Sequence, residues 1–181
     1  MSSTFLYFAS ERLSSAELTG ARLDGDLVEI GEAFMPTDAV ETPELRAASL
    51  RASIPETVAV TRPRSAWLHG ATAAAPARHT VQRRVAVRGN QVIDPRLEYR
   101  GHLVEQRYLT WVGCLWATTP AYTLTDLIRA HCAGEDTASA VASLLAWRPE
   151  LAAEAQQLLE DGRAVHHKRP ALAFLRAVRT T

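Results

Sequence analysis

Proline at expected helix starts is the feature of this sequence that most restricts its fold. Proline is favoured at the first helical position, because the N–H that it lacks is one that a helix start leaves unbonded anyway. Helix starts are therefore predicted at Thr42-Pro43-Glu44, Pro63, Thr119-Pro120, Pro149-Glu150 and Pro170. Apolar residues at helical spacing follow, as in Leu124, Leu127 and Ile128. The last third of the chain is accordingly expected to be helical.

Short apolar segments bounded by turn residues predict strands in the first two thirds of the chain. Near the N-terminus, Ser14 or Ser15 caps a short helix that ends at Gly25, and a ribbon of Leu27–Ile30 and Ala33–Met35 follows. Further strands are expected at residues 58–60, 79–82, 85–87 and 103–109.

A helix followed at once by a β-ribbon is the arrangement that ends a winged helix-turn-helix. The predicted fold class is therefore α+β, in two parts. Residues 1–42 form a small winged helix-turn-helix-like module, and residues 43–181 form a mixed α/β domain that ends in several helices.

The composition is that of an ordinary globular protein. Of 181 residues, 47% are hydrophobic and 22% are charged, which excludes disordered and fibrous classes. No run approaches the roughly 18 apolar residues of a membrane helix, and the N-terminus lacks the pattern of a signal peptide. Two cysteines are too few for a disulfide framework. We expect a cytoplasmic protein with no membrane partner.

The formal net charge of zero conceals two oppositely charged segments. Residues 1–45 hold nine acidic residues against two arginines, whereas residues 46–112 hold eleven arginines against four acidic residues. Such segregation predicts either a nucleic-acid contact in the basic segment or a partner for the acidic one. The acidic segment could also dock on the protein's own basic segment.

Serines and arginines near predicted helix starts and strands are the candidate DNA-binding residues. Guanidinium groups and backbone N–H groups at a helix start bind phosphate well, and a basic ribbon can lie along nucleic acid. The candidates are Ser14, Ser15, Arg22, Arg62, Arg64, Arg78, Arg83, Arg84 and Arg88. The alternative interpretation of each is a residue of an ordinary solvated surface.

The sequence predicts no enzyme. It holds no glycine-rich phosphate loop, no G-x-S-x-G motif and no H-E-x-x-H motif. The adjacent pair His131-Cys132 points in two directions on a helix and is a poor metal chelator. Asp94 and Glu98, expected in a loop, offer a weak alternative as Mg²⁺ ligands of a reduced nuclease. We therefore predict no catalytic residues, no cofactor and no metal.

Three stretches, in this order, resemble the AbiEi-type antitoxins of type IV toxin–antitoxin systems, in the form common in actinobacteria. The first runs from Leu13 through Gly25-Asp26-Leu27-Val28 to Pro36, the second joins Arg46–Leu50, Val58–Val60 and Ser65–Gly70, and the third is Ala117–Leu127. Tyr122 stands where the family usually has arginine, so the partner of Asp126 must differ here.

This resemblance implies a non-catalytic antitoxin with a winged helix-turn-helix. Such a protein binds DNA to repress its own operon and counters a nucleotidyltransferase-like toxin. Glu29 and Glu32 stand in the ribbon where relatives usually carry arginine. The alternative is therefore a protein-interaction module with a degenerate DNA-binding domain and no toxin partner.

Overall fold

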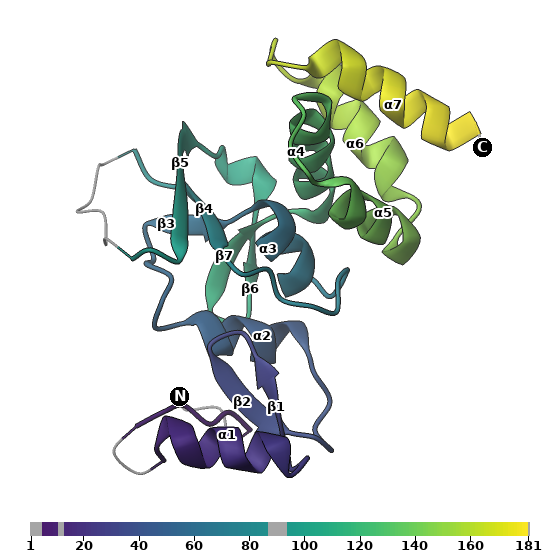
Figure 1. Cartoon of the computed structure of the whole chain (residues 1–181). Helices are drawn as coiled ribbons and strands as arrows, with labels where there is room; N and C mark the ends of the chain where they lie inside the picture. The colour runs from purple at the N-terminus through teal and green to yellow at the C-terminus, as the bar shows by residue number, and fades with distance from the viewer. Residues whose placement is uncertain (1–4, 11–12, 87–93, 181) are drawn as a thin grey trace.

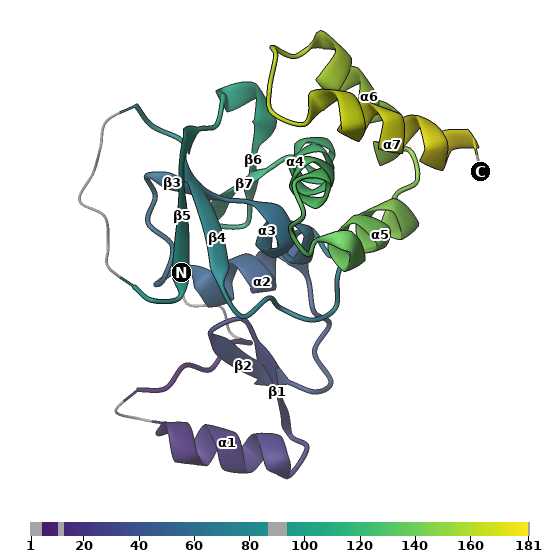
Figure 2. The same ribbon diagram turned by 45° about the horizontal axis from the view of Figure 1, so that its top comes forward.

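The computed structural model describes residues 5–10, 13–86 and 94–180 of a mixed α+β protein. Three parts follow one another along the molecule (Figure 1). A helix–ribbon unit lies at one end, a sheet with two helices lies in the middle, and four helices lie beside the sheet and away from the unit. The same arrangement is seen after rotation (Figure 2).

The helix–ribbon unit forms where the sequence predicts it. Helix α1 spans Ser15–Leu23, and strands β1 (Leu27–Ile30) and β2 (Ala33–Pro36) pair antiparallel. Ser14 caps α1 in a capping box with Glu17, in which the Glu17 N–H donates to the Ser14 hydroxyl at 3.2 Å. Only one helix precedes the ribbon within residues 5–10 and 13–26.

A five-stranded sheet forms the middle of the molecule, in the order β5-β4-β3-β7-β6. Its strands are β3 (Val58–Val60), β4 (His79–Arg83), β5 (Leu97–Leu103), β6 (Leu109–Val112) and β7 (Leu115–Thr118). Strand β3 is antiparallel to β4 and parallel to β7, and β5 runs parallel to β4. Two helices, α2 (Pro43–Leu50) and α3 (Arg62–Leu68), begin at the predicted proline signals.

Two predicted strands are wrong. Residues 103–109 do not form one strand, because β5 ends at Leu103, a 3-10 turn spans Gln106–Tyr108 and β6 begins at Leu109. Val85 and Ala86 form a bend, and Val87 lies outside the described residues. Strand β4 pairs instead with β3 and β5, so residues 79–82 do not form a basic ribbon with residues 85–86.

The C-terminal third is helical, as predicted. Its helices are α4 (Pro120–Cys132), α5 (Ala138–Trp147), α6 (Leu151–Asp161) and α7 (Lys168–Thr180). Their inward faces share a core that includes Leu124, Leu127, Leu144 and Leu175. No helix in the described part of the chain is long and apolar enough to cross a membrane.

One apolar core joins the helix–ribbon unit to the sheet. Ile30 and Met35 of the ribbon pack in the same cluster as Leu50 of α2, Trp67 of α3 and Val60 of β3. The predicted boundary at residue 42 therefore falls in a linker between α2 and the ribbon, but the buried surface continues across it.

Candidate functional site

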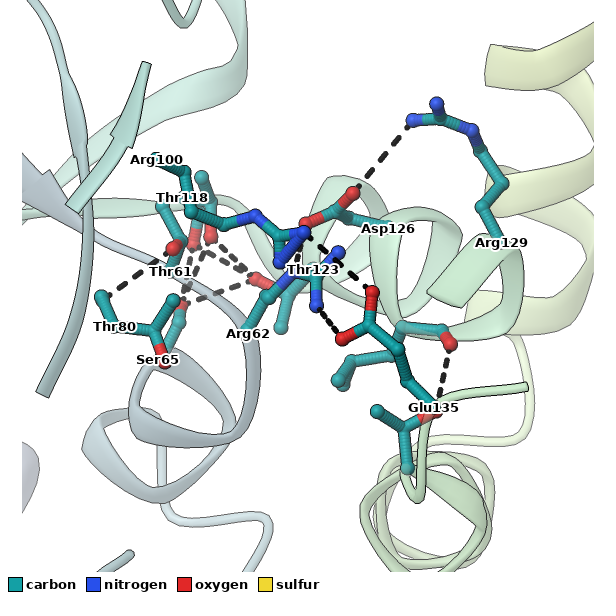
Figure 3. Close-up of polar contacts among 12 residues, drawn as sticks. Thr61, Arg62, Ser65, Thr80, Arg100, Thr118, Thr123, Asp126, Arg129 and Glu135 are labelled. Carbon is teal, nitrogen blue, oxygen red and sulfur yellow. Dashed lines mark hydrogen bonds and ion pairs between the residues drawn. The ribbon is translucent and has the colours of Figure 1, made fainter. Parts of the chain in front are cut away.

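A buried polar network connects the start of α3, the end of β7 and the first turn of α4 (Figure 3). The Ser65 hydroxyl bonds the Thr118 carbonyl oxygen at 3.1 Å and lies 3.0 Å from the Thr123 hydroxyl. The Thr118 and Thr123 hydroxyls lie 2.7 Å apart, and all three residues are buried. Buried hydroxyls need such partners, so the network fixes how α3 and α4 meet the sheet.

Arg62, a buried residue at the start of α3, forms two ion pairs. Its Nε donates to Asp126 of α4 at 2.9 Å, and its Nη1 donates to Glu135 at 2.5 Å. Arg129 adds a 3.6 Å contact with Asp126, and Arg100 a 3.5 Å contact with Glu135. The arginine has φ = 57°, a left-handed conformation that is uncommon outside glycine. The side-chain contacts therefore hold a conformation that the backbone disfavours.

The charges around Arg62 stabilise one another. Burial opposes the charged guanidinium, but Asp126 and Glu135 outweigh it, so the pKa of Arg62 is raised. The hydrogen bond from Arg62 holds the pKa of Glu135 below its usual value. With its donors directed into the protein, this arginine acts as a clamp between α3 and α4.

Tyr122, on the first turn of α4, lies in an aromatic contact beside the sheet. Its ring stacks on Tyr108 with centroids 4.6 Å apart, on the sheet face opposite α2. Burial, with the charge of Asp126, raises the pKa of Tyr122 to about 12. Arg62 and Arg129 supply the positive partners of Asp126.

Trp67 lies between two arginines at the other end of α3. The guanidinium carbon of Arg46 lies 5.0 Å from the ring centroid, and that of Arg64 lies 5.2 Å from it. Arg46 also pairs with Glu41 at 2.7 Å. Arg64 is 3% exposed, and burial lowers its pKa to about 10, so the side chain still carries its charge at neutral pH.

Glu32, in the turn of the ribbon, links the acidic unit to the basic sheet region. Its Oε1 lies 2.8 Å from the Nε2 of buried His79 at the start of β4, and its Oε2 pairs with Arg96. Arg96 also pairs with Asp94 at 3.1 Å. Burial lowers the pKa of His79, aided by the positive charge of Arg64.

The structure corrects the expected surface placement of two candidate DNA-binding residues. Arg62 and Arg64 both lie in the interior. Arg62 forms ion pairs with Asp126 and Glu135, and the Arg64 Nη2 donates a hydrogen bond to the Pro76 carbonyl oxygen. The first turn of α3 is buried at Arg62, Arg64 and Ser65.

The other candidates do not gather into one site. Ser14, Ser15 and Arg22 are exposed on α1, although the Ser14 hydroxyl caps the helix and Arg22 pairs with Glu29 at 3.2 Å. Arg78 is exposed before β4. At the other end of β4, Arg83 is half-buried and Arg84 lies over the Trp116 ring at 5.2 Å. Arg88 lies outside the described residues.

The alternative nuclease site gains no support from the geometry. Asp94 is hydrogen-bonded to Arg96, which holds its pKa below the usual value. Glu98 lies in β5 rather than in the predicted loop, and His131 packs edge-on against Phe174. Among residues 5–10, 13–86 and 94–180, no cluster of three or more His, Cys, Asp or Glu could hold a metal ion.

Residues that the sequence reasoning missed, above all Glu32, Arg46 and Glu135, form many of these contacts. Each is a charged residue with at least one partner far away in the chain, so no local pattern marks it. His69 and Trp67 of the second stretch serve the interior: the His69 Nε2 lies 2.8 Å from the Thr118 carbonyl oxygen, and Trp67 packs in the core at 1% exposed.

No protein-family model matches the chain, and no curated protein matches it either. The AbiEi resemblance therefore depends on the three quoted stretches. Residues of the second stretch and the third stretch contact one another in the buried network, through Ser65, His69, Thr118 and Thr123.

Proposed function

We propose that this protein is a non-catalytic, AbiEi-like antitoxin that acts in the cytoplasm. It binds DNA to repress its own operon and counters a nucleotidyltransferase-like toxin. The observation that carries the proposal is the meeting of the second and third stretches in one network of Ser65, Thr118 and Thr123. Two sequence matches whose residues also contact one another support the family resemblance better than two separate matches do.

The DNA-binding half of the proposal places α1 and the ribbon as the recognition helix and wing of a reduced winged helix-turn-helix. The exposed N-terminus of α1 carries Ser15, and its last turn carries the exposed Arg22. Exposed Arg78 lies apart from α1, before β4. Phosphate contacts are expected from these residues and from Arg83 and Arg84, because phosphate neutralisation supplies most of the affinity.

Fluorescence anisotropy with the DNA upstream of the gene that encodes this protein tests the DNA-binding half of the proposal. The four described arginines that remain candidates predict a slope of log K against log salt of about −3 to −4. Arg22→Gln should weaken binding and make the slope less negative by about 1, whereas Arg148→Gln, at a half-buried position at the C-terminal end of α5, should change neither. Equal binding to upstream and scrambled duplexes at low salt would refute the regulatory role.

Co-expression tests the antitoxin half. If the neighbouring gene encodes a nucleotidyltransferase, its product should arrest growth alone, and this chain should relieve the arrest. Thr123→Val removes a hydroxyl from the network and should reduce the rescue, because it loosens α4 against α3. Growth arrest that persists with a folded wild-type chain would refute the antitoxin role.

A second candidate function is a protein-interaction module without DNA binding. The observation that favours it is that several arginines are buried or paired within the protein and so do not face a DNA partner. Arg62 and Arg64 are buried, and Arg96 pairs with Glu32. This alternative predicts co-purification with one partner protein and no protected region on the upstream DNA. A footprint on that DNA would exclude it.

A further inference from the structure

Aromatic side chains gather on the sheet face opposite α2. In β7, Leu115 and Ala117 pack in the core with α2, so Trp116 between them points to the other face. Trp111 of β6 lies directly opposite Trp116 in the strand register and shares that face. Together with the stacked tyrosine pair, these rings form what we call the aromatic face: Tyr108, Trp111, Trp116 and Tyr122.

Trp111 is the accessible ring of the aromatic face. It is 51% exposed, although tryptophan is on average one of the more buried residue types. Its ring meets that of Trp116 edge-on, with centroids 5.2 Å apart and planes at 72°. Strand β6 is the last strand of the sheet, so the ring is also open from the sheet edge. A large exposed ring beside other aromatic rings indicates a binding surface.

Arg84 brings a positive charge to this face. Its guanidinium carbon lies 5.2 Å from the ring centroid of Trp116, and its Nε donates to the Glu56 carbonyl oxygen. The Glu56 carboxylate pairs with Arg51 instead, and no carboxylate of the described residues lies within ion-pair distance of Arg84. The charge of Arg84 is therefore left for a partner from outside the chain.

Arg107 repeats this arrangement on the tyrosine pair. Its guanidinium carbon lies 4.8 Å from the ring centroid of Tyr108, and its Nη2 lies 2.9 Å from Glu105. Both charged side chains are exposed, so this ion pair is weak and leaves Arg107 accessible to another anion. The aromatic face thus presents two pairs of rings, each with an arginine over one ring.

We propose that the aromatic face binds single-stranded nucleic acid. A base stacks on Trp111, and phosphates pair with Arg84 and Arg107. Cations beside aromatic rings are the means by which proteins bind single strands with little regard to sequence. A duplex fits less well, because its bases are stacked on one another and do not reach a ring.

A protein partner fits less well for a similar reason. An acidic segment would pair with the arginines and leave Trp111 exposed, whereas an apolar segment would cover Arg84 without giving it an anion. Single-stranded nucleic acid supplies a flat ring and a negative charge in each repeating unit. The inference goes beyond the duplex recognition proposed above and does not depend on it, since the helix–ribbon unit takes no part.

Fluorescence anisotropy with labelled oligo-U and oligo-dT strands of about 12 nucleotides tests the proposal, because this length is within the site sizes of single-strand binders. The wild-type chain should bind at least one of them, with a slope of log K against log salt of about −1.4 for two neutralised phosphates. Arg84→Gln should bind more weakly and make that slope less negative by about 0.7. Absence of binding to both strands at low salt would overturn the proposal and leave a protein as the occupant of the face.

Two tryptophan variants locate the binding. Trp111→Ala should weaken it about tenfold, because one stacked base loses its ring. The matched control is Trp147→Ala, since Trp147 is 38% exposed and also has an arginine over its ring, Arg148 at 5.6 Å, but lies on α5 outside the sheet. This control should bind as the wild type does.

Circular dichroism establishes that each variant is folded, and Arg84→Gln tests the same face if Trp111→Ala fails to fold. Folded Trp111→Ala that binds single strands as well as the wild type would refute the site, as would an equal loss in Trp147→Ala. Trp111→Ala should bind the upstream duplex as the wild type does. A failure of this inference is thereby distinguished from a failure of the DNA-binding function proposed above.

Discussion

Neutralising Asp126 should destabilise the protein more than any exposed charge change. The Asp126 side chain is 13% exposed and the Arg62 side chain is 8% exposed, so both charged groups are largely desolvated in the folded protein. Breaking one partner of a buried pair costs about 3–5 kcal/mol. Glu135 still contacts Arg62 at 2.5 Å but is 45% exposed, so we expect Asp126→Asn to fall at the lower end, about 3 kcal/mol.

A double-mutant cycle separates the pair from other effects. Arg62→Met removes the charge and retains an apolar side chain, and Arg62→Met with Asp126→Asn removes both charges. Residues in direct contact show coupling of about 0.5–3 kcal/mol, and a buried pair should fall near the upper end, about 2 kcal/mol. The double variant should therefore be less destabilised than the sum of the two single variants.

Urea unfolding at pH 7, followed by far-UV circular dichroism, measures these free energies. The matched control is Arg148→Gln, whose arginine side chain is 39% exposed and pairs at the surface with Glu150 at 2.9 Å and Glu154 at 3.6 Å, so its loss should cost less than about 1 kcal/mol. High salt should weaken the surface pair and leave the buried pair largely unchanged. A cost of Asp126→Asn no larger than that of the control would refute the assignment of Arg62 as a clamp.

Three further outcomes follow from the structure. Burial lowers the pKa of His69 and of His79 in the folded protein. As pH drops from about 7 to 5.5, these histidines bind protons more readily in the unfolded chain, so the free energy of unfolding should fall. A urea midpoint that stays constant over this range would contradict the prediction. Glu135→Gln should be most destabilising above about pH 4.5 and approach wild type in urea titrations as pH falls further, because the folded pKa of Glu135 is lowered. Gly31→Ala should cost about 1–3 kcal/mol in urea unfolding, since φ is 56° and the added Cβ would meet the Ser49 hydroxyl.

The helices were predictable because their start signals are local. Thr42 accepts a hydrogen bond from the Leu45 N–H at 3.3 Å, and Thr119 accepts one from the Tyr122 N–H at 3.4 Å, as a capping residue before proline should. Thr137 shows that a threonine before a helix does not always cap it. It precedes α5, but its hydroxyl donates to the Leu127 carbonyl oxygen, because tertiary packing offers a buried acceptor.

The strands were less predictable because pairing partners lie far apart in the chain. Residues 103–109 have apolar residues at both ends, yet the strand that pairs with β4 is centred earlier, with His79 opposite Leu97. Val104 instead donates its N–H to the Arg83 carbonyl oxygen and packs over the sheet with Leu109. Register of this kind is set by which surfaces are buried, and local propensity does not encode it.

The opposite charges of the two segments partly neutralise each other through ion pairs within the protein. Acidic Glu32 and Glu41 lie in the N-terminal segment, and their partners Arg96 and Arg46 lie in the basic one. Because paired guanidiniums contribute little field at a distance, the formal excess in residues 46–112 overstates the positive charge that a partner would meet. The acidic segment thus docks on the basic segment through Glu32, and any DNA affinity must come from the arginines that this docking leaves unused.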